Sequence, residues 1–392
     1  MSRVRMKTFI VNRNTPDLAE NQRCQVKLMS ERVPWLENEV IVYNCDEEPF
    51  QGKLSGHCRA LQEHGSGDCD YYWFNHPDLS FAIDMDCLSK LIGVMERNHW
   101  IAVISPTEKR KTYASMIKEG YRWHPVATCD YLSLLVRRSV VDRIGFMNPE
   151  FKYSWGAIHE YSYKVYREGW CVAYCDAAKM HHFGGTTYGG KGAVQRDVYI
   201  KNAKAFARQY FVEHYGKSWD REFARLLPPG VANNYRAHRK HWERGERLAT
   251  VLSMLNFIKE HALMRAGWGR KPIRVRLGCD GTNRRGWVGI DPDIKLRPHF
   301  VADPTDLNMF EDESVDEVEC SRRLVPVERG NTGVAEALGE WRRVLKPKGT
   351  LSLTCDDALG RELQTGFGGL EWAPCRGVAR EGAGLVTLTY RK

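Results

Sequence analysis

The sequence predicts an α/β protein with two sheet-forming domains joined by a helical linker. Residues 7–190 alternate short apolar runs with stretches of helical pattern, which is typical of a layered fold around a largely parallel sheet. Residues 195–268 are strongly charged and compatible with helix, and residues 272–392 begin a second strand–loop–strand series. A chain of 392 residues is long enough for two or three domains.

The domain limits follow from two features of the middle of the chain. Residues 236–247 form a basic, helix-compatible run, which is either a solvated linker surface or a surface that faces phosphates. Gly267 and Gly269, ahead of Pro272, mark the start of the second series of strands. We therefore predict a first domain over residues 1–235, a linker over 236–270 and a second domain over 271–392.

Composition narrows the class of protein. With 43% hydrophobic and 27% charged residues, the chain has enough apolar material for sizeable cores. No run approaches the roughly 18 apolar residues of a membrane span, so none is expected. Twelve cysteines are scattered without a CxxC pair and no secretory signal is evident, which predicts a reducing, cytoplasmic location. The net charge of +9 suits a phosphate-bearing partner, either a sugar nucleotide or a nucleic acid.

The elements of the first domain can be assigned in order. A buried-strand pattern at residues 8–11 is followed by Thr15 and Pro16, a candidate N-cap and first helical position. Later elements are strands near residues 40–43, 71–74, 100–104 and 131–136, with helices near 86–97 and 137–145. Ligands bind at the carboxyl ends of strands in such sheets, so polar residues directly after each strand are candidates for function.

Two strands are followed by such residues. Asn44 and Asp46 come after the second strand, and Asn75 and Asp78 come after the third. Amides can hold a base or ribose, whereas a carboxylate can hold the divalent cation that neutralises a departing diphosphate. Asn-His-Pro-Asp is also a turn-forming sequence, so a simple bend is the alternative.

Together these segments resemble the inverting family-2 glycosyltransferases of GT-A fold, especially the rhamnosyltransferase-like branch, over residues 7–235. The resemblance implies a nucleoside-diphosphate sugar as donor, with UDP- or dTDP-sugars favoured, Mn²⁺ or Mg²⁺ as cofactor, and a hydroxyl acceptor. It also implies donor-binding and metal-binding residues. These are Asn12, Asn44, Asp46 and Asn75 for the nucleotide, and Asp78 and His182 for the metal. Arg59 is a further candidate for the phosphates.

The general base that deprotonates the acceptor stays open. The family carries an acidic motif ahead of a basic residue, and here only Glu160 fills an acidic position before Lys164. A base must lie within hydrogen-bond reach of the acceptor hydroxyl. Glu160 is the first choice, His159 the second and Asp130 the third.

The second domain opens with a strand at residues 273–277, a glycine-bearing turn, and a strand that ends in Asp291. A glycine after the first strand and an acid after the second can hold a nucleoside. Residues 272–357 resemble the class I S-adenosylmethionine-dependent methyltransferases of Rossmann-like fold in a shortened form. The resemblance implies S-adenosylmethionine as a second cofactor, bound by Gly278, Asp280, Asp291 and Asp306.

Several functions remain open at this point. One is transfer of a sugar to a glycan hydroxyl, coupled to methylation of a sugar hydroxyl by the second domain. Another keeps the glycosyltransferase and makes the second domain non-catalytic. A third places the sugar on a hydroxylated base of a nucleic acid, and a fourth is a nucleic-acid methyltransferase with an inert first domain.

Overall fold

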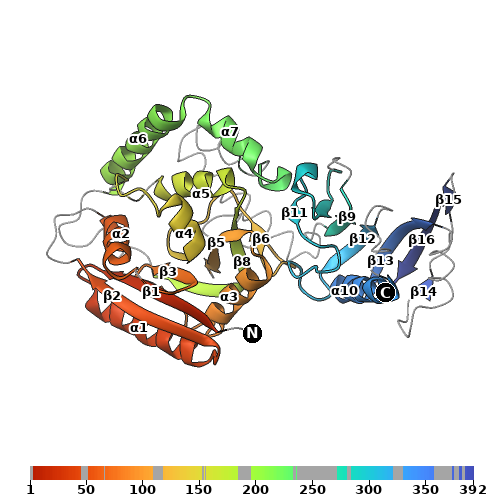
Figure 1. Ribbon diagram of the computed structural model, residues 1–392, viewed down its shortest axis with the longest axis horizontal. Helices are drawn as coiled ribbons and strands as arrows, with labels where there is room; N and C mark the ends of the chain where they lie inside the picture. The colour runs from red at the N-terminus through yellow and green to blue at the C-terminus, as the bar shows by residue number, and fades with distance from the viewer. Residues whose placement is uncertain are drawn as a thin grey trace. The chain divides into compact units, whose positions relative to one another are not determined.

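The computed structural model describes residues 3–45, 52–65, 67–108, 118–151, 154, 156–183, 196–232, 235, 272–279, 284–320, 330–356, 373–374, 379–381 and 385–392. The chain forms two compact units, each built on its own sheet, which confirms the α/β class (Figure 1). The first unit takes in residues 1–118 and 123–227, and the second takes in residues 119–122 and 228–392. The linker predicted over 236–270 lies outside the described residues, so the domain limits stay a prediction. No described helix combines the length and apolarity of a membrane crossing.

The sheet of the first unit has the strand order β2-β1-β3-β7-β5-β8-β4, and β6 pairs with β8. Its strands are β1 (Val4–Asn12), β2 (Leu36–Asn44), β3 (Tyr71–Asn75), β4 (Leu79–Ser80), β5 (Ile101–Glu108), β6 (His124–Pro125), β7 (Ser133–Arg137) and β8 (Cys171–His182). β1, β2 and β3 are parallel, as are β5 and β8, whereas β7 runs antiparallel to β3 and β5. The sheet, predicted to be largely parallel, is therefore mixed.

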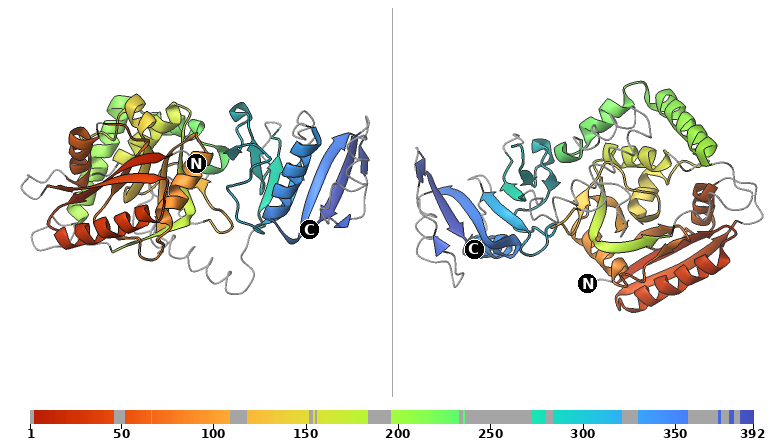
Figure 2. Two further views of the ribbon diagram at one scale, coloured as in Figure 1. Left: turned by 60° about the horizontal axis from the view of Figure 1, so that its bottom comes forward. Right: turned by 180° about the vertical axis from the view of Figure 1, so that it is seen from behind.

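Helices cover both faces of this sheet, with α1 and α3 on one face and α2, α4 and α5 on the other (Figures 1 and 2). The helices are α1 (Pro16–Glu31), α2 (Gly52–His64), α3 (Cys87–Arg97), α4 (Arg138–Ile144), α5 (Ala157–Arg167), α6 (Arg196–Tyr215) and α7 (Trp219–Leu226). Every residue of β3 and β5 is buried, because a sheet covered on both faces has no solvated side. This burial explains the continuous apolar runs at residues 71–74 and 100–104.

The start of α1 differs in detail from its prediction. Pro16 begins the helix and Thr15 holds the N-cap position, but the Thr15 side chain makes no capping hydrogen bond. The Asn12 Oδ1 atom instead accepts the Thr15 N–H at 3.0 Å. The amide at the end of β1 therefore orders the strand-to-helix turn, an interaction that asparagine favours.

The sheet of the second unit has the order β11-β10-β9-β12-β13-β16-β14, and β15 pairs with β16. The elements are β9 (Arg274–Leu277), β10 (Val288–Asp291), η1 (Ile294–Leu296), β11 (Phe300–Val301), β12 (Val315–Cys320), α10 (Gly330–Val344), β13 (Leu345–Asp356), β14 (Ala373–Pro374), β15 (Ala379–Glu381) and β16 (Leu385–Arg391). The strands from β11 to β13 are parallel and β16 is antiparallel to β13, so the predicted Rossmann-like fold is confirmed. The chain adds strands outward from β9 toward β11 on one side and from β12 toward β13 on the other, so the strand order switches direction between β9 and β12. Sheets of this type bind ligands at such a switch point.

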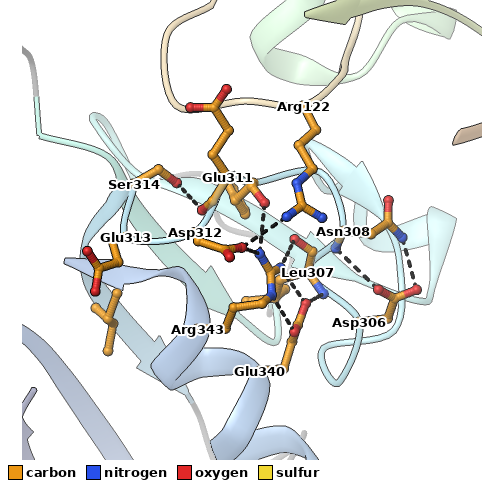
Figure 3. Close-up of polar contacts among 12 residues, drawn as sticks. Arg122, Asp306, Leu307, Asn308, Glu311, Asp312, Glu313, Ser314, Glu340 and Arg343 are labelled. Carbon is orange, nitrogen blue, oxygen red and sulfur yellow. Dashed lines mark hydrogen bonds and ion pairs between the residues drawn. The ribbon is translucent and has the colours of Figure 1, made fainter. Parts of the chain in front are cut away.

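A short segment, residues 119–122, belongs to this second unit although its neighbours in sequence belong to the first. Tyr121 forms a β-bridge with Phe310, and the Arg122 N–H donates to the Met309 carbonyl at 2.9 Å. The Arg122 guanidinium also donates to Asp312, which Arg343 of α10 contacts from another direction (Figure 3).

Arg343 is the centre of the polar network shown in Figure 3. Its guanidinium donates to Asp312 at 2.6 Å, to both carboxylate oxygens of Glu340, and to the backbone carbonyls of Leu307 and Phe310. The Arg343 side chain is only 25% exposed. If the guanidinium is removed, water can reach its hydrogen-bond acceptors only in part and replaces the lost hydrogen bonds poorly.

We expect Arg343→Ala to lower the free energy of unfolding of the second unit by about 2 kcal/mol, because Glu340 and the Leu307 and Phe310 carbonyls lose a charged hydrogen-bond donor. Differential scanning calorimetry measures this as a lower transition temperature. Arg342→Ala is the matched control, since Arg342 makes no ion pair within the described part of the chain. Equal effects of the two substitutions would contradict the assignment.

Candidate functional site

The polar residues predicted to bind the donor lie at one edge of the first sheet. β1 pairs with β2 so that Asn12 is opposite Asn44, and with β3 so that Ile10 is opposite Asn75. Because the three strands are parallel, their carboxyl ends share this edge. The carboxyl ends of β5 and β8 share it as well, since β7 is antiparallel to both β3 and β5.

Asn12 and Asn44 form a pair of side chains at this edge. The Asn12 Nδ2 atom donates to the Asn44 Oδ1 atom at 2.8 Å. Asn12 is buried and its other amide atom holds the start of α1, whereas Asn44 is exposed. Asn44 is therefore the member of the pair that a ligand can reach. Asp46, predicted beside it, lies outside the described residues.

A second cluster forms where β3 ends and the chain turns into β4. β4 pairs with the end of β8, with Leu79 opposite His182, and this register brings His182 beside Asp78. The His182 Nε2 and Asp78 Oδ2 atoms are 3.2 Å apart. The Lys53 Nζ atom of α2 lies 3.6 Å from the Asp78 Oδ1 atom and 3.1 Å from the His76 Nδ1 atom. We call Lys53, His76, Asp78 and His182 the Asp78 cluster.

The charges of the Asp78 cluster are set by mutual contact in a mostly buried place. Burial opposes ionisation of Asp78, which is 2% exposed, but the hydrogen bond to His182 and the charge of Lys53 hold its pKa well below the ordinary value. Burial likewise works against protonated His182, yet its contact with Asp78 raises its pKa. Burial lowers the pKa of Lys53 and the charge of Asp78 partly offsets this. The cluster is thus a carboxylate held between two basic groups.

Buried polar side chains surround the turn that carries Asp78. Both side-chain atoms of Asn75, which is fully buried, and the His76 Nε2 atom lack a hydrogen-bond partner among the described residues. His57 faces the Asn75 carbonyl at 3.2 Å, and burial lowers its pKa to about 3, so it is neutral. The Gln22 amide donates to the His76 carbonyl at 2.7 Å. Buried polar atoms without partners are uncommon in proteins, and a bound water or ligand atom would satisfy them.

Asp130 approaches the Asp78 cluster from the strand next to β3. β3 and β7 are antiparallel with Asn75 opposite Ser133, and the His76 N–H donates to the Leu132 carbonyl at 2.9 Å. Asp130 lies two residues before Leu132, just ahead of β7. Burial raises the pKa of Asp130 to about 6, and the charge of His182 opposes that rise.

Glu160, the first choice for the general base, is engaged elsewhere. It lies on α5, is 1% exposed, and its Oε1 atom accepts the Tyr215 hydroxyl at 2.5 Å and faces Lys164 at 3.2 Å. These contacts tie α5 to the end of α6. His159 is half-buried on the same helix. The catalytic role of both residues stays a prediction, as does that of Arg59, which is half-buried on α2.

The Asp78 cluster does not fit a metal centre built by the protein. The described residues contain no group of three or more His, Cys, Asp or Glu side chains arranged to hold a metal ion. Asp78 and His182 offer two donor atoms and already contact each other, so the other ligands of a Mg²⁺ ion would have to come from water and phosphate. Lys53 also stands 3.6 Å from the carboxylate. Two unit charges 4 Å apart repel by about 4 kcal/mol near a protein surface, and a divalent ion doubles that figure.

The predicted cofactor residues of the second unit hold backbone turns. The Asp291 Oδ2 atom accepts the Cys279 N–H and its Oδ1 atom accepts the Asp293 N–H, both at 2.8 Å. Gly278 has a φ of 81°, a conformation that favours glycine. Asp306 is exposed and accepts two hydrogen bonds from Asn308 (Figure 3). Asp280 lies outside the described residues.

The connection between β9 and β10 is short for this type of fold. Residues 278–287 join two adjacent parallel strands, a crossover that usually contains an α-helix and needs a dozen or more residues. Ten residues leave no room for a helix of ordinary length together with its two turns. None of the described residues of this connection, 278–279 and 284–287, is helical.

Sequence reasoning missed Lys53 and His76 and ranked Asp130 low. No motif singles out Lys53, because it reaches the site from α2 while the other members come from strand ends. The available signal for Asp130 was its position shortly before β7, which mirrors the position of Asp78 after β3. That signal requires knowing that the two strands are antiparallel neighbours.

Comparison with known proteins gives distant structural likenesses. No protein-family model matches the chain, and no curated protein matches its sequence. A mannosyltransferase from Pyrobaculum calidifontis, solved with GDP-Man and Mn²⁺, is 12% identical over 68% of this chain and 84% of its own, with a TM-score of 0.41. A mutant of the Drosophila β-1,4-galactosyltransferase 7, solved with manganese, UDP-Gal and xylobiose, is 14% identical over 46% of this chain and 71% of its own, with a TM-score of 0.30.

The other likeness concerns a methyltransferase. A mutant of the 16S rRNA (adenine(1408)-N(1))-methyltransferase from Catenulisporales acidiphilia, solved with the cosubstrate SAM, is 14% identical over 34% of this chain and 90% of its own. Its TM-score is 0.26. The chain is thus distantly similar to a glycosyltransferase fold over the larger share of its length and to a methyltransferase fold over about a third.

Proposed function

We propose that the first unit transfers a sugar from a nucleoside-diphosphate sugar to a hydroxyl group, with inversion at the anomeric carbon. One observation carries the proposal: the Asp78 cluster lies at the same sheet edge as the Asn12–Asn44 pair. An exposed amide suits the nucleoside, and basic groups held by a carboxylate suit the diphosphate.

The proposed roles at the donor follow from exposure and charge. Asn44 is exposed and contacts the base or ribose, while Asn12 positions it. Lys53 and protonated His182 face the diphosphate, and Asp78 holds both of them. The donor supplies hydrogen-bond partners to the buried atoms of Asn75 and His76 that have none among the described residues. UDP- or dTDP-sugars are the proposed donors, by the sequence resemblance.

The proposed chemistry is a single displacement. The acceptor oxygen attacks the anomeric carbon as the bond from that carbon to the diphosphate oxygen breaks, and the bonding electrons leave with the diphosphate. Asp130 is the proposed base that takes the acceptor proton, because a carboxylate with a pKa of about 6 is ionised at neutral pH and still accepts a proton readily. Glu160 and His159 are the alternatives that the sequence favours.

The acceptor is proposed to be a glycan hydroxyl. The alternative acceptor, a hydroxylated base of a nucleic acid, draws its support from the basic run at 236–247, which lies outside the described residues. A reducing compartment such as the cytoplasm is proposed because the described cysteines are free thiols.

A panel of nucleotide sugars tests the proposed function. Purified full-length protein is incubated with UDP-, dTDP- and GDP-sugars, with chelator and separately with Mn²⁺, and release of the nucleoside diphosphate is measured. We expect hydrolysis of at least one member of the panel. Absence of hydrolysis and of binding for every member under both conditions would rule the function out.

The second unit is proposed to be non-catalytic, although its fold resembles methyltransferases. The connection at residues 278–287 is too short for the usual helix, and both carboxylate oxygens of Asp291 are occupied by backbone N–H groups. We expect no heat when S-adenosylmethionine is titrated into the full-length protein in a calorimeter. Saturable binding with a micromolar Kd that Asp291→Ala abolishes would instead support methyl transfer.

A further inference from the structure

We propose that Lys53 takes the place of a divalent cation at the donor diphosphate, so that the first unit binds nucleoside diphosphates without a metal. This inference rests on the proposed function, because it names the group that meets the diphosphate in the same site. It departs from the sequence-based expectation of Mn²⁺ or Mg²⁺ held by Asp78 and His182.

The position of Lys53 supports its role in place of a metal ion. Its ammonium group is 3.6 Å from the Asp78 Oδ1 atom, on the side of the carboxylate that His182 does not contact. A metal ion bound to that oxygen would need the space near the ammonium and would be repelled by its charge. The Lys53 side chain is 18% exposed, so it is largely held in place but remains open to a ligand.

The surroundings of Lys53 bear on this role as well. Lys53 lies in the first turn of α2, a helix of 13 residues, and helix N-termini favour negative charge. The Asp78 carboxylate lies between Lys53 and His182, and the carboxyl groups of Asp130 and Glu108 also act on His182. Lys53 is therefore the group of the cluster that we assign to the diphosphate.

The Asp78 carboxylate is engaged on both sides in this arrangement. One oxygen faces Lys53 and the other faces His182, so its part is to position two cationic groups. The His76 Nδ1 atom, 3.1 Å from the ammonium, accepts a hydrogen bond from it. The contact with Asp78 is an ion pair at 3.6 Å, and a lysine has three N–H donors, so the ammonium can also donate to a phosphate oxygen.

Calorimetric titration of UDP, dTDP and GDP tests the inference. Wild-type protein is titrated with excess EDTA and separately with Mn²⁺, and the expected affinities agree within about threefold. Lys53→Met should weaken binding in EDTA by about tenfold or more, because a hydrogen bond to a charged group is lost. Lys53→Arg should retain metal-free binding, and Lys27→Met, a change at an exposed lysine of α1, should have no effect. Thermal unfolding of each variant confirms that it is folded.

The outcomes separate this inference from the proposed function. Binding that needs Mn²⁺ and tolerates Lys53→Met would overturn the role of Lys53 and leave the glycosyltransferase intact. Partial rescue of Lys53→Met by Mn²⁺, without any Mn²⁺ effect on the wild type, would support the inference strongly. No binding of any nucleotide under either condition would overturn both.

Discussion

Asp78→Asn is expected to lower the rate of nucleotide-sugar turnover by about 100-fold, in the range found when one preorganised electrostatic group is removed from an active site. The carboxylate contacts both Lys53 and His182, and its loss frees the two side chains from their positions. It also removes the contact that raises the pKa of His182.

The same substitution has a distinguishing signature. The affinity for the nucleoside diphosphate should change less than the rate constant of turnover, because Asp78→Asn has two opposing effects on binding. Loss of the negative charge favours the bound anion, whereas loss of the contacts that position Lys53 and His182 weakens its binding. Steady-state kinetics and calorimetry on one preparation separate the two quantities. Asp86→Asn, at an exposed carboxylate paired with Arg32, is the control. Full activity of Asp78→Asn would exclude the cluster from the site.

Asp130→Asn is expected to lower the rate of sugar transfer by about 1,000-fold, within the range for loss of a general base, while the donor still binds. An amide cannot take the acceptor proton. Activity of the wild type should rise with pH through an apparent pKa of about 6, because burial raises the pKa of Asp130 to that value and only the ionised form is a base. Below that pH the carboxyl is protonated and the rate should fall.

Glu160→Gln separates this assignment from the sequence-based alternative. Glu160 is bonded to Tyr215 and Lys164, so its loss should lower stability more than turnover per folded molecule. Transfer rates at several pH values, normalised to folded protein, distinguish the two carboxylates. Loss of transfer in Glu160→Gln together with retained transfer and an unchanged pH profile in Asp130→Asn would show that Glu160 is the base.

Much of the fold was predictable because strand burial leaves a direct pattern in the sequence. β3 and the first half of β5 are buried on both faces and therefore appear as apolar runs, and α3 lies where a helix was predicted. The reversed direction of β7 was not predictable, because a buried strand has the same composition in either direction.

The site was predictable only in part, for a related reason. Asp78 and Asn75 lie at the end of a strand, and this position implies a ligand edge in any parallel sheet. Lys53 and Asp130 depend on tertiary placement, since one reaches the edge from a helix and the other precedes an antiparallel strand. In the second unit, the number of residues between β9 and β10 was visible in the sequence, but its meaning depended on the parallel pairing of those strands.

A crystal structure with the bound nucleotide sugar that the hydrolysis panel identifies tests the central claim most directly. We expect the diphosphate at the sheet edge beside the Asp78 cluster, with phosphate oxygens within about 3.2 Å of the Lys53 Nζ atom and of the His182 ring. Electron density for the diphosphate at another part of the chain, with Lys53 and His182 contacting only Asp78, would contradict the account.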